Sequence, residues 1–420
     1  MSKLLILIVV VLGILAVAQL ARVYELTSRL RGKREEDISP ADNRMNATLM
    51  WVFGVAYFAF FLWLVIAYKD KMLPLAASQQ GVDTDWLMDF NWIILAIAFV
   101  VTNVLLFYFA GKYVYSKERR AFWQPHNNKL ELAWTIAPAA MLAVIIIYGL
   151  AAWNEITAPA SPDAVVVELY AKQFDWTARY PGSDGMMGAT DFRLINGENP
   201  LGIVTEGSIT ARLAELEAEI HAMDSAAAHA ILSDAKMSEM EDRLAYLQRM
   251  RSRVVNLRTV MEQDIKVNGA ASAYLHGADD VVTKDFLLPV HKEVNILIRS
   301  RDVIHSAFIP HLRIQMNAVP GMTTQMKVVP TITTDSMRTH VMKDPSFDFI
   351  LMCNKICGAS HYNMQMPLIV TTAAEFDTWV AEQNKKPFQA PADGGSKGVT
   401  APAIAEPVTL DSAGVAISMN

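Results

Sequence analysis

Four long apolar stretches dominate the first 153 residues of this 420-residue chain and restrict that part to membrane-spanning helices. They lie near 4–24, 47–67, 89–110 and 132–153. Each is close to the roughly 20 apolar residues that a helix needs to cross a bilayer. None is interrupted by lysine or arginine until its end, and 52% of the whole chain is hydrophobic. We therefore expect four transmembrane helices.

The positive charges between these stretches predict their orientation. The loops near 25–46 and 111–131 each carry five basic residues, whereas the loop between them has two lysines beside three aspartates. Cytoplasmic loops are enriched in lysine and arginine. The chain is therefore expected to start outside, to cross four times, and to lie outside the cytoplasm from about residue 154 onward.

The first apolar stretch has a second possible interpretation. Lys3 precedes it, and Ala16-Val17-Ala18 resembles the cleavage site of a signal peptide. Removing the stretch would leave three spans, which would put the rest of the chain in the cytoplasm or reverse the charge bias. We favour a retained anchor, although the sequence alone does not decide whether residues 1–24 are kept.

The segment Cys353–Met364 predicts a metal site. It contains the only two cysteines of the chain, with His361 between the second of them and Met364. Thiolates and thioethers are soft ligands that suit copper, and imidazole suits copper too. A disulfide is the alternative for a cysteine pair in an exported domain. A structural zinc site is disfavoured, since it would need four Cys or His ligands.

A further histidine precedes this segment. His305 lies just beyond a predicted strand at 293–298, where polar and apolar residues alternate. Predicted strands at 347–352 and 366–371 flank the cysteine segment. Two loops at strand ends can bring their side chains to one metal.

This pattern resembles the CuA domain of subunit II of haem–copper cytochrome c oxidases. The resemblance covers roughly 88–204 and 266–382, and it implies a membrane-α plus all-β fold. The family has a two-helix membrane hairpin, matched here by the third and fourth of the four expected helices, followed by a cupredoxin-like β-barrel that holds a dinuclear copper centre, CuA. The implied copper ligands are His305, Cys353, Lys355 through its backbone carbonyl, Cys357, His361 and Met364.

The resemblance also implies a function. Such a subunit accepts electrons from a cytochrome c donor and passes them to haem in subunit I, where oxygen is reduced to water and protons are pumped. The expected partners are subunits I and III, and a cytochrome c or c-type haem domain on a separate chain, since this chain has no Cys-x-x-Cys-His motif. The expected location is the bacterial inner membrane, with the C-terminal domain in the periplasm.

Three alternatives stay open at this stage. They are a CuA-bearing subunit of a nitric oxide reductase-type haem–copper enzyme, a copper-free quinol oxidase subunit, and a copper chaperone. The quinol oxidase subunit would lack the ligands, all of which are present here. The sequence has no phosphate-binding loop and no nucleic-acid motif, so we expect no nucleic-acid partner.

Three positions outside the ligand set carry expectations from the family. Phe174 stands where the family has the tryptophan at which electrons enter, and Trp176 follows within a predicted strand at 165–176. Both rings could instead simply fill the barrel. Glu131 matches a family glutamate at the mouth of a proton channel, but a carboxylate at a helix start also suits the helix dipole.

Lys355 is a departure from the family, which has a glutamate there that binds magnesium beside subunit I. An ammonium group is a poor neighbour for a divalent cation, so the resemblance leaves the magnesium site doubtful. Lysine at this position, together with the Gln-Phe-x-Trp strand, resembles the branch of the family found in Bacteroidetes-type bacteria.

The remaining segments complete the expected domain plan. Residues 1–67 hold two additional helices, 88–153 the family hairpin and 154–382 the copper domain. An insertion at 205–265 has apolar residues at coiled-coil spacing, which predicts a helical hairpin that turns near 224–234. It is a candidate docking arm for a respiratory supercomplex partner. The Pro- and Ala-rich segment 383–420 is predicted to be disordered.

Overall fold

The computed structural model describes residues 2–30, 39–116, 118–229 and 233–388. They fall into two compact units. One consists of Met1–Pro74 with Trp86–Tyr148, and the other of Leu75–Asp85 with Gly149–Asn420. Most of the segment expected to be a disordered tail, from residue 389, lies outside the described residues.

Four helices in the described residues are long and apolar enough to cross a membrane, which confirms that part of the predicted fold. They are α1 (Ser2–Leu30), α2 (Pro40–Met72), α3 (Gln79–Lys112) and α4 (Asn128–Thr157). Local chemistry sets two of the starts. Ser39 caps α2 by accepting a hydrogen bond from the Asp42 amide at 3.1 Å, and Asn127 accepts one from the Leu130 amide at 3.2 Å before α4.

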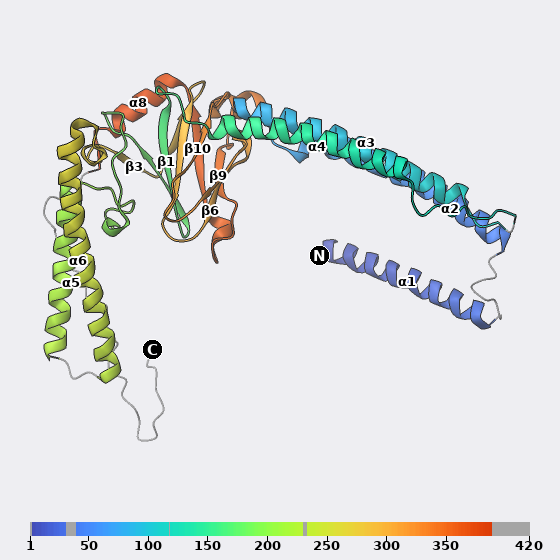
Figure 1. The fold of residues 1–420 in the computed structure, drawn as a ribbon, viewed down its shortest axis with the longest axis horizontal. Coiled ribbons are helices and arrows are strands. Elements are labelled where there is room, and N and C mark those ends of the chain that lie inside the picture. Colours follow the sequence, from blue (N-terminus) through green and yellow to red (C-terminus); the bar gives the residue numbers. More distant parts are fainter. Residues whose placement is uncertain (1, 31–38, 117, 230–232, 389–420) are drawn as a thin grey trace. The chain divides into compact units, whose positions relative to one another are not determined.

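Helices α2 and α3 lie side by side (Figure 1), and aromatic rings and glycines form the contact between them. The Phe53 and Phe107 ring centroids are 5.7 Å apart. A Cβ on Gly54 would stand only 3.0 Å from the Phe107 ring, so glycine permits this close approach. Gly111 stands against Trp51 in the same way. Small residues at helix contacts are typical of membrane proteins, where packing rather than exclusion of water holds helices together.

The extramembrane unit contains two five-stranded sheets, in the orders β3-β2-β1-β5-β8 and β4-β10-β9-β6-β7. Together they form the predicted cupredoxin-like fold. The strands are β1 (Val165–Lys172), β2 (Asp175–Tyr180), β3 (Val281–Thr283), β4 (Phe286–Pro289), β5 (Val294–Ser300), β6 (His305–Ile309), β7 (Ile314–Ala318), β8 (Thr324–Val328), β9 (Phe349–Cys353) and β10 (Gln365–Thr371). The helix α8 (Ala373–Gln383) follows, with short turns α7 (Thr334–Ser336) and η6 (His361–Asn363) in the loops.

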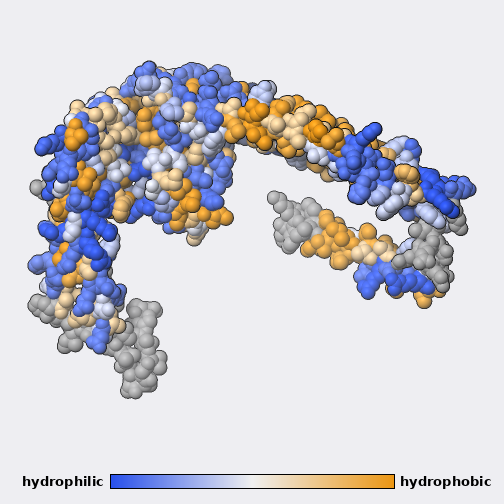
Figure 2. Space-filling model, viewed as in Figure 1, coloured by the Kyte–Doolittle hydropathy of each residue, from blue (hydrophilic) through white to orange (hydrophobic). Residues whose placement is uncertain are grey.

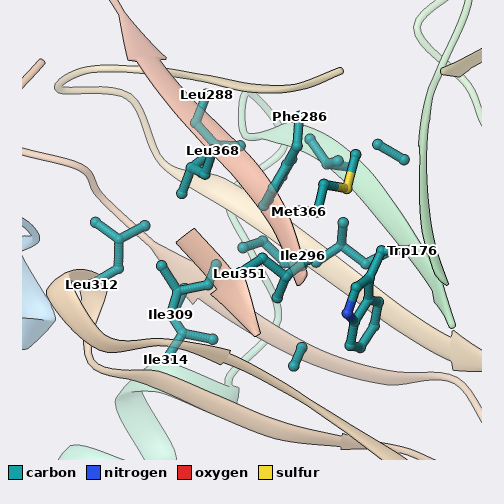
Figure 3. Packing of buried hydrophobic residues seen from close by; sticks show 14 of the residues in the cluster. Trp176, Phe286, Leu288, Ile296, Ile309, Leu312, Ile314, Leu351, Met366 and Leu368 are labelled. Atoms are coloured by element: carbon teal, nitrogen blue, oxygen red, sulfur yellow. The ribbon is translucent and has the colours of Figure 1, made fainter. Parts of the chain in front are cut away.

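One apolar core lies between these sheets. It takes side chains from both, including Ile296 of β5, Leu351 of β9 and Leu368 of β10 (Figure 3). Strand β5 buries every second residue, as its alternating sequence predicts. The segments that carry the predicted metal ligands therefore extend from a rigid, close-packed core.

Two local predictions differ from the structure. The run 165–176 is a hairpin of β1 and β2 rather than one strand, with its turn at Gln173-Phe174. Strand β2 then continues to Tyr180, beyond the end of the predicted strand at Trp176. The phenol of Tyr180 donates to the Leu287 carbonyl at 2.9 Å, so a tertiary contact extends the strand. His305, in turn, begins β6 instead of standing between strands.

The insertion is a pair of helices, α5 (Glu206–His229) and α6 (Asp234–Asn268). The two lie side by side and carry mostly hydrophilic side chains on the visible face (Figures 1 and 2). They share a core of their own, which includes Leu216, Leu247 and Val254 from the predicted seam. Ion pairs such as Arg251 with Glu217, at 2.9 Å, bridge the helices on the outside.

A buried charge network joins the barrel to the base of this insertion. Arg179 donates to Glu168 at 3.0 Å and to the Gly188 carbonyl at 2.7 Å, and it also pairs with Asp280. Arg299 pairs with Glu168 from the other side. Burial acts to raise the pKa of Glu168, but the two guanidinium groups outweigh it and the pKa is lowered. The charges are therefore mutually compensated away from water.

The first residues of α3 are also fastened to the barrel. Arg313 makes a two-point ion pair with Asp85, at 2.7 and 2.8 Å. Ser78, which is fully buried, donates to the Leu312 carbonyl at 2.8 Å. Paired carboxylate and guanidinium groups of this geometry fix direction as well as distance.

Candidate metal centre

Two neighbouring strands place the predicted ligands. His305 is the first residue of β6 and Cys353 is the last of β9, and these strands pair at Ala307 and Cys353. The loop then returns to β10, where the Cys353 amide donates to the Met364 carbonyl at 3.0 Å. The loop is thus closed at its base by the sheet itself.

The structure brings all six predicted donor atoms together. The sulfur atoms of Cys353 and Cys357 are 3.9 Å apart. The Nδ1 atom of His305 lies 3.8 Å from the Cys353 sulfur, and the Nδ1 of His361 lies 3.6 Å from the Cys357 sulfur. The Met364 sulfur is 3.8 Å from the Cys357 sulfur, and the Lys355 carbonyl oxygen is 3.2 Å from the Cys353 sulfur.

These distances fit soft metal ions better than a disulfide. A bonded pair of sulfurs would be about 2.05 Å apart, and both cysteines are free. Two sulfurs that bind the same metal ion at about 2.3 Å can be at most about 4.6 Å apart. The pair of thiols therefore suits shared metal ions, and each thiol has its own histidine beside it. Thiolate, imidazole and thioether together match copper chemistry.

Burial sets the protonation of the site. The side chain of His305 is fully buried, and Cys357 and Met364 are 5% and 1% exposed. Burial, together with the neighbouring Cys353, raises the pKa of the Cys357 thiol to about 11. At neutral pH this thiol keeps its proton until a metal cation displaces it.

Asp302 orients His305, which the sequence analysis did not predict. Its Oδ1 lies 2.8 Å from the Nε2 of His305, and its Oδ2 accepts a hydrogen bond from the Gln173 amide at 2.8 Å. A carboxylate on one ring nitrogen leaves the other, Nδ1, free to face the cysteines. Burial acts to raise the pKa of Asp302, but these hydrogen bonds outweigh it and lower the pKa. The sequence signal for this role is an aspartate three residues before a predicted ligand histidine.

The two aromatic candidates lie in different surroundings. Trp176 is 1% exposed, and its ring lies edge-on to that of His305, with 6.2 Å between the centroids. Phe174 is half-buried and stands against the cysteine loop, where a Cβ on Gly358 would come within 2.8 Å of its ring. Gln173 also donates to the Cys357 carbonyl. Both rings thus border the cluster from the β1–β2 turn.

Lys355 is exposed and Glu131 is half-buried. The Lys355 side chain points away from the cluster and is exposed, while only its carbonyl faces the sulfur. Glu131 lies in the first turn of α4, where it accepts a hydrogen bond from the Asn127 amide at 3.0 Å. Its visible contact is therefore that of a helix cap.

The loop also presents apolar side chains to solvent. Ile356 is 85% exposed and Tyr362 is 86% exposed, and both lie next to ligand positions. These two side chains are therefore available for contact with a partner.

Models of one protein family match the chain in two places. The model described as "Cytochrome C oxidase subunit II, periplasmic domain" matches residues 254–373, which include every predicted ligand. The model described as "Cytochrome C oxidase subunit II, transmembrane domain" matches residues 46–152, from α2 through α4. Together the two matches take in more than half of the chain.

Individual relatives agree with these matches. The alternative cytochrome c oxidase subunit 2 of Bradyrhizobium diazoefficiens is 27% identical over 315 residues, or 74% of this chain and 83% of the relative. The cytochrome c oxidase subunit 2 of Cereibacter sphaeroides is 21% identical over 308 residues, 73% and 78% of the two chains. A solved periplasmic domain of subunit II of cytochrome oxidase (CoxB) from Bradyrhizobium japonicum, with 15% identity, aligns with 54% of this chain and 97% of its own at a TM-score of 0.26.

Proposed function

The chain belongs to the cytochrome c oxidase subunit II family, and from this we propose that it receives electrons from a cytochrome c donor at a CuA centre and passes them to haem in subunit I. Oxygen reduction to water and proton pumping then take place in subunit I. Membership of the family makes the chain a subunit of a haem–copper oxidoreductase, in the bacterial inner membrane with its C-terminal domain in the periplasm.

The convergence of the six donor atoms carries this proposal. His305, Cys353, Cys357, His361 and Met364 would hold the metal through side chains, and Lys355 through its carbonyl. A dinuclear copper centre held by these residues would supply one-electron transfer, with the electron delocalised over both ions. A quinol oxidase subunit would not need these ligands.

The surrounding residues keep the site rigid and dry. Asp302 holds the His305 ring by its Nε2 atom, so that the ring does not turn when the charge of the site changes. Trp176 covers the same ring and excludes water from it. We assign electron input to the side of Phe174 and Trp176, since both rings border the cluster from one turn.

The exposed side chains of the ligand loop suggest where a partner subunit would bind. Ile356 and Tyr362 would be covered by subunit I, because a path for electrons out of the cluster must leave through the loop. Subunit III, a donor on a separate chain and a supercomplex partner of the α5–α6 hairpin complete the proposed assembly. Glu131 would act at the mouth of a proton channel in subunit I.

In this proposal no magnesium ion is bound at the border with subunit I, because Lys355 stands where the family has a magnesium-binding glutamate. Its ammonium group carries a fixed positive charge and no oxygen ligand. Metal analysis of the purified oxidase should find copper without a magnesium ion at this border. A magnesium ion retained there by other oxygen ligands would overturn this part.

Copper loading of the full chain tests the assignment directly. Two coppers per chain and an EPR signal of one electron shared over two nuclei are expected. The variant Cys357→Ser should lose that signal, while Ser183→Ala, at an exposed loop of the same domain, should keep it. A single copper with a mononuclear spectrum would contradict the proposal and favour a chaperone.

The isolated complex distinguishes oxygen from nitric oxide as substrate. Reduced cytochrome c should drive oxygen consumption, and Cys357→Ser should abolish it. Rapid nitric oxide reduction with negligible oxygen consumption would favour the alternative enzyme class.

A further inference from the structure

A groove runs along the α2–α3 pair. It has a volume of about 560 Å³ and is lined by Leu49, Met50 and Phe53 of α2 and by Leu106, Phe107 and Ala110 of α3, with Asn46 at one end. The ring of Phe107 is held against Gly54, which draws the helices together beside the groove. Apart from Asn46, every lining side chain is apolar.

The groove lies toward the cytoplasmic ends of its helices. The C-terminal domain is periplasmic, so α4 ends outside, and the connection 113–127 and the start of α2 lie on the cytoplasmic side. Asn46 is in the second turn of α2, and Ala110 is in the last turn of α3. The depression therefore opens at the depth of inner-leaflet acyl chains.

Cationic side chains gather at this end. Tyr113 lies one turn beyond Ala110, and the Arg119 guanidinium stands 5.9 Å from its ring centroid. Arg119 also donates to the Lys112 carbonyl at 3.4 Å. Within the described part of the chain, neither Arg119 nor Lys112 forms an ion pair with a carboxylate, and Glu118 is the nearest acid in sequence. Figure 2 shows the apolar band of these helices giving way to hydrophilic side chains at this end.

We propose that this groove binds one anionic phospholipid of the inner leaflet. An acyl chain fills the apolar depression, because a hollow on a lipid-facing surface must be occupied by lipid or protein. Lys112 and Arg119 receive the phosphate, as basic clusters at the cytoplasmic ends of membrane helices commonly do. Asn46 is the one polar residue of the lining, and its amide can donate to the glycerol ester region.

Lipid retention tests the proposal with the full chain. The protein is reconstituted in nanodiscs with equal amounts of phosphatidylglycerol and phosphatidylethanolamine and then released into detergent. The retained lipid is counted by native mass spectrometry. One phosphatidylglycerol per chain is expected, and the double variant Lys112→Gln with Arg119→Gln should lower its retention at least tenfold. The matched control is Lys69→Gln with Lys71→Gln, which removes the same charge at the opposite end of α2 and should change nothing.

A second variant separates the groove from the charges. Ala110→Phe fills the groove and leaves both cations in place, and it should also lose the lipid. Far-UV circular dichroism and size-exclusion chromatography of every variant report that the helices remain folded. Equal retention in both charge variants would overturn the proposal, as would equal retention of phosphatidylethanolamine. In the assembled oxidase, a cross-link from a cysteine at position 110 to a helix of another subunit would show that protein, rather than lipid, occupies the groove.

Discussion

At the scale of single residues, the copper site depends on side chains that do not themselves face the metal. Asp302 fixes the ring of His305 and at the same time accepts the amide of the β1–β2 turn. This one carboxylate thus ties the ligand on β6 to the aromatic residues proposed for electron input. The sequence offers only a weak signal for this role, an aspartate three residues before a ligand histidine, because a short polar side chain before a strand is usually just solvated.

Replacing Asp302 with asparagine should weaken copper binding about 10- to 100-fold, the usual effect of losing a carboxylate behind a metal-bound histidine. Asparagine keeps the shape but can present an N–H to the ring, which no longer fixes the tautomer. A competition titration with a copper chelator measures the change. Asp163→Asn, at an exposed position of the same domain, is the control. Unchanged affinity in Asp302→Asn would show that the ring is held by packing alone.

His276 should make the base of the insertion sensitive to pH. Its Nδ1 lies 2.6 Å from an Asp184 oxygen and its Nε2 lies 3.0 Å from the Ala270 carbonyl. Both partners are acceptors, and a neutral imidazole has only one N–H, so the doubly protonated ring fits best. The hydrogen bond to Asp184 raises the pKa of His276 above 6.5, and Asp279 contributes in the same sense.

The direction in which stability changes with pH follows from this raised pKa. The stabilisation is fully present below about pH 6.5 and is lost as the pH rises through the pKa of the folded state. Amide exchange in 182–185 and 269–276 should therefore be slower at pH 6 than at pH 8, after correction for the intrinsic rate. The difference should vanish in His276→Gln. A pH effect that persists in that variant would point to other groups.

At the scale of elements, the hairpin of α5 and α6 holds together through its own core. Leu247→Ala should destabilise it by about 2–5 kcal/mol, because Leu247 is 1% exposed and its removal leaves a cavity. Val255→Ala, at an exposed position of the same helix, should cost far less. Amide exchange along both helices measures the effect. The copper spectrum should not change, and a changed spectrum would mean that the hairpin and the metal loop are coupled.

The elements also show which predictions the sequence supports. Transmembrane helices and the α5–α6 seam follow from long apolar patterns, and the ligand set follows from the resemblance of the Cys353–Met364 segment to a known family. The β1–β2 turn was missed because Gln173-Phe174 contains no glycine or proline to mark it. Strand β2 was cut short because Arg179 looks like a loop residue until Glu168 and Asp280 are seen to bury it. The first case depends on local turn chemistry, and the second on contacts between distant segments.

At the scale of the whole molecule, the metal should stabilise the extramembrane unit. Its ligands come from β6, β9 and the loop before β10, so they meet only when the fold is complete. A ligand at 100 times its dissociation constant stabilises the folded state by about 2.7 kcal/mol. Copper should therefore raise the Tm of this unit, measured by calorimetry of the full chain. Cys357→Ser should show a much smaller rise, and an equal rise would locate the binding elsewhere.

The pairing of β2 with β3 has a consequence for how such a chain can change over time. Tyr180 and Val281 face each other across this pair, although 100 residues of chain separate them. The two ends of the insertion are thus already neighbours, and the entropy of closing a loop grows only slowly with its length. Material between them can be lengthened, trimmed or exchanged while the barrel and its copper loop stay as they are. The hairpin is in this sense a replaceable module of the extramembrane unit.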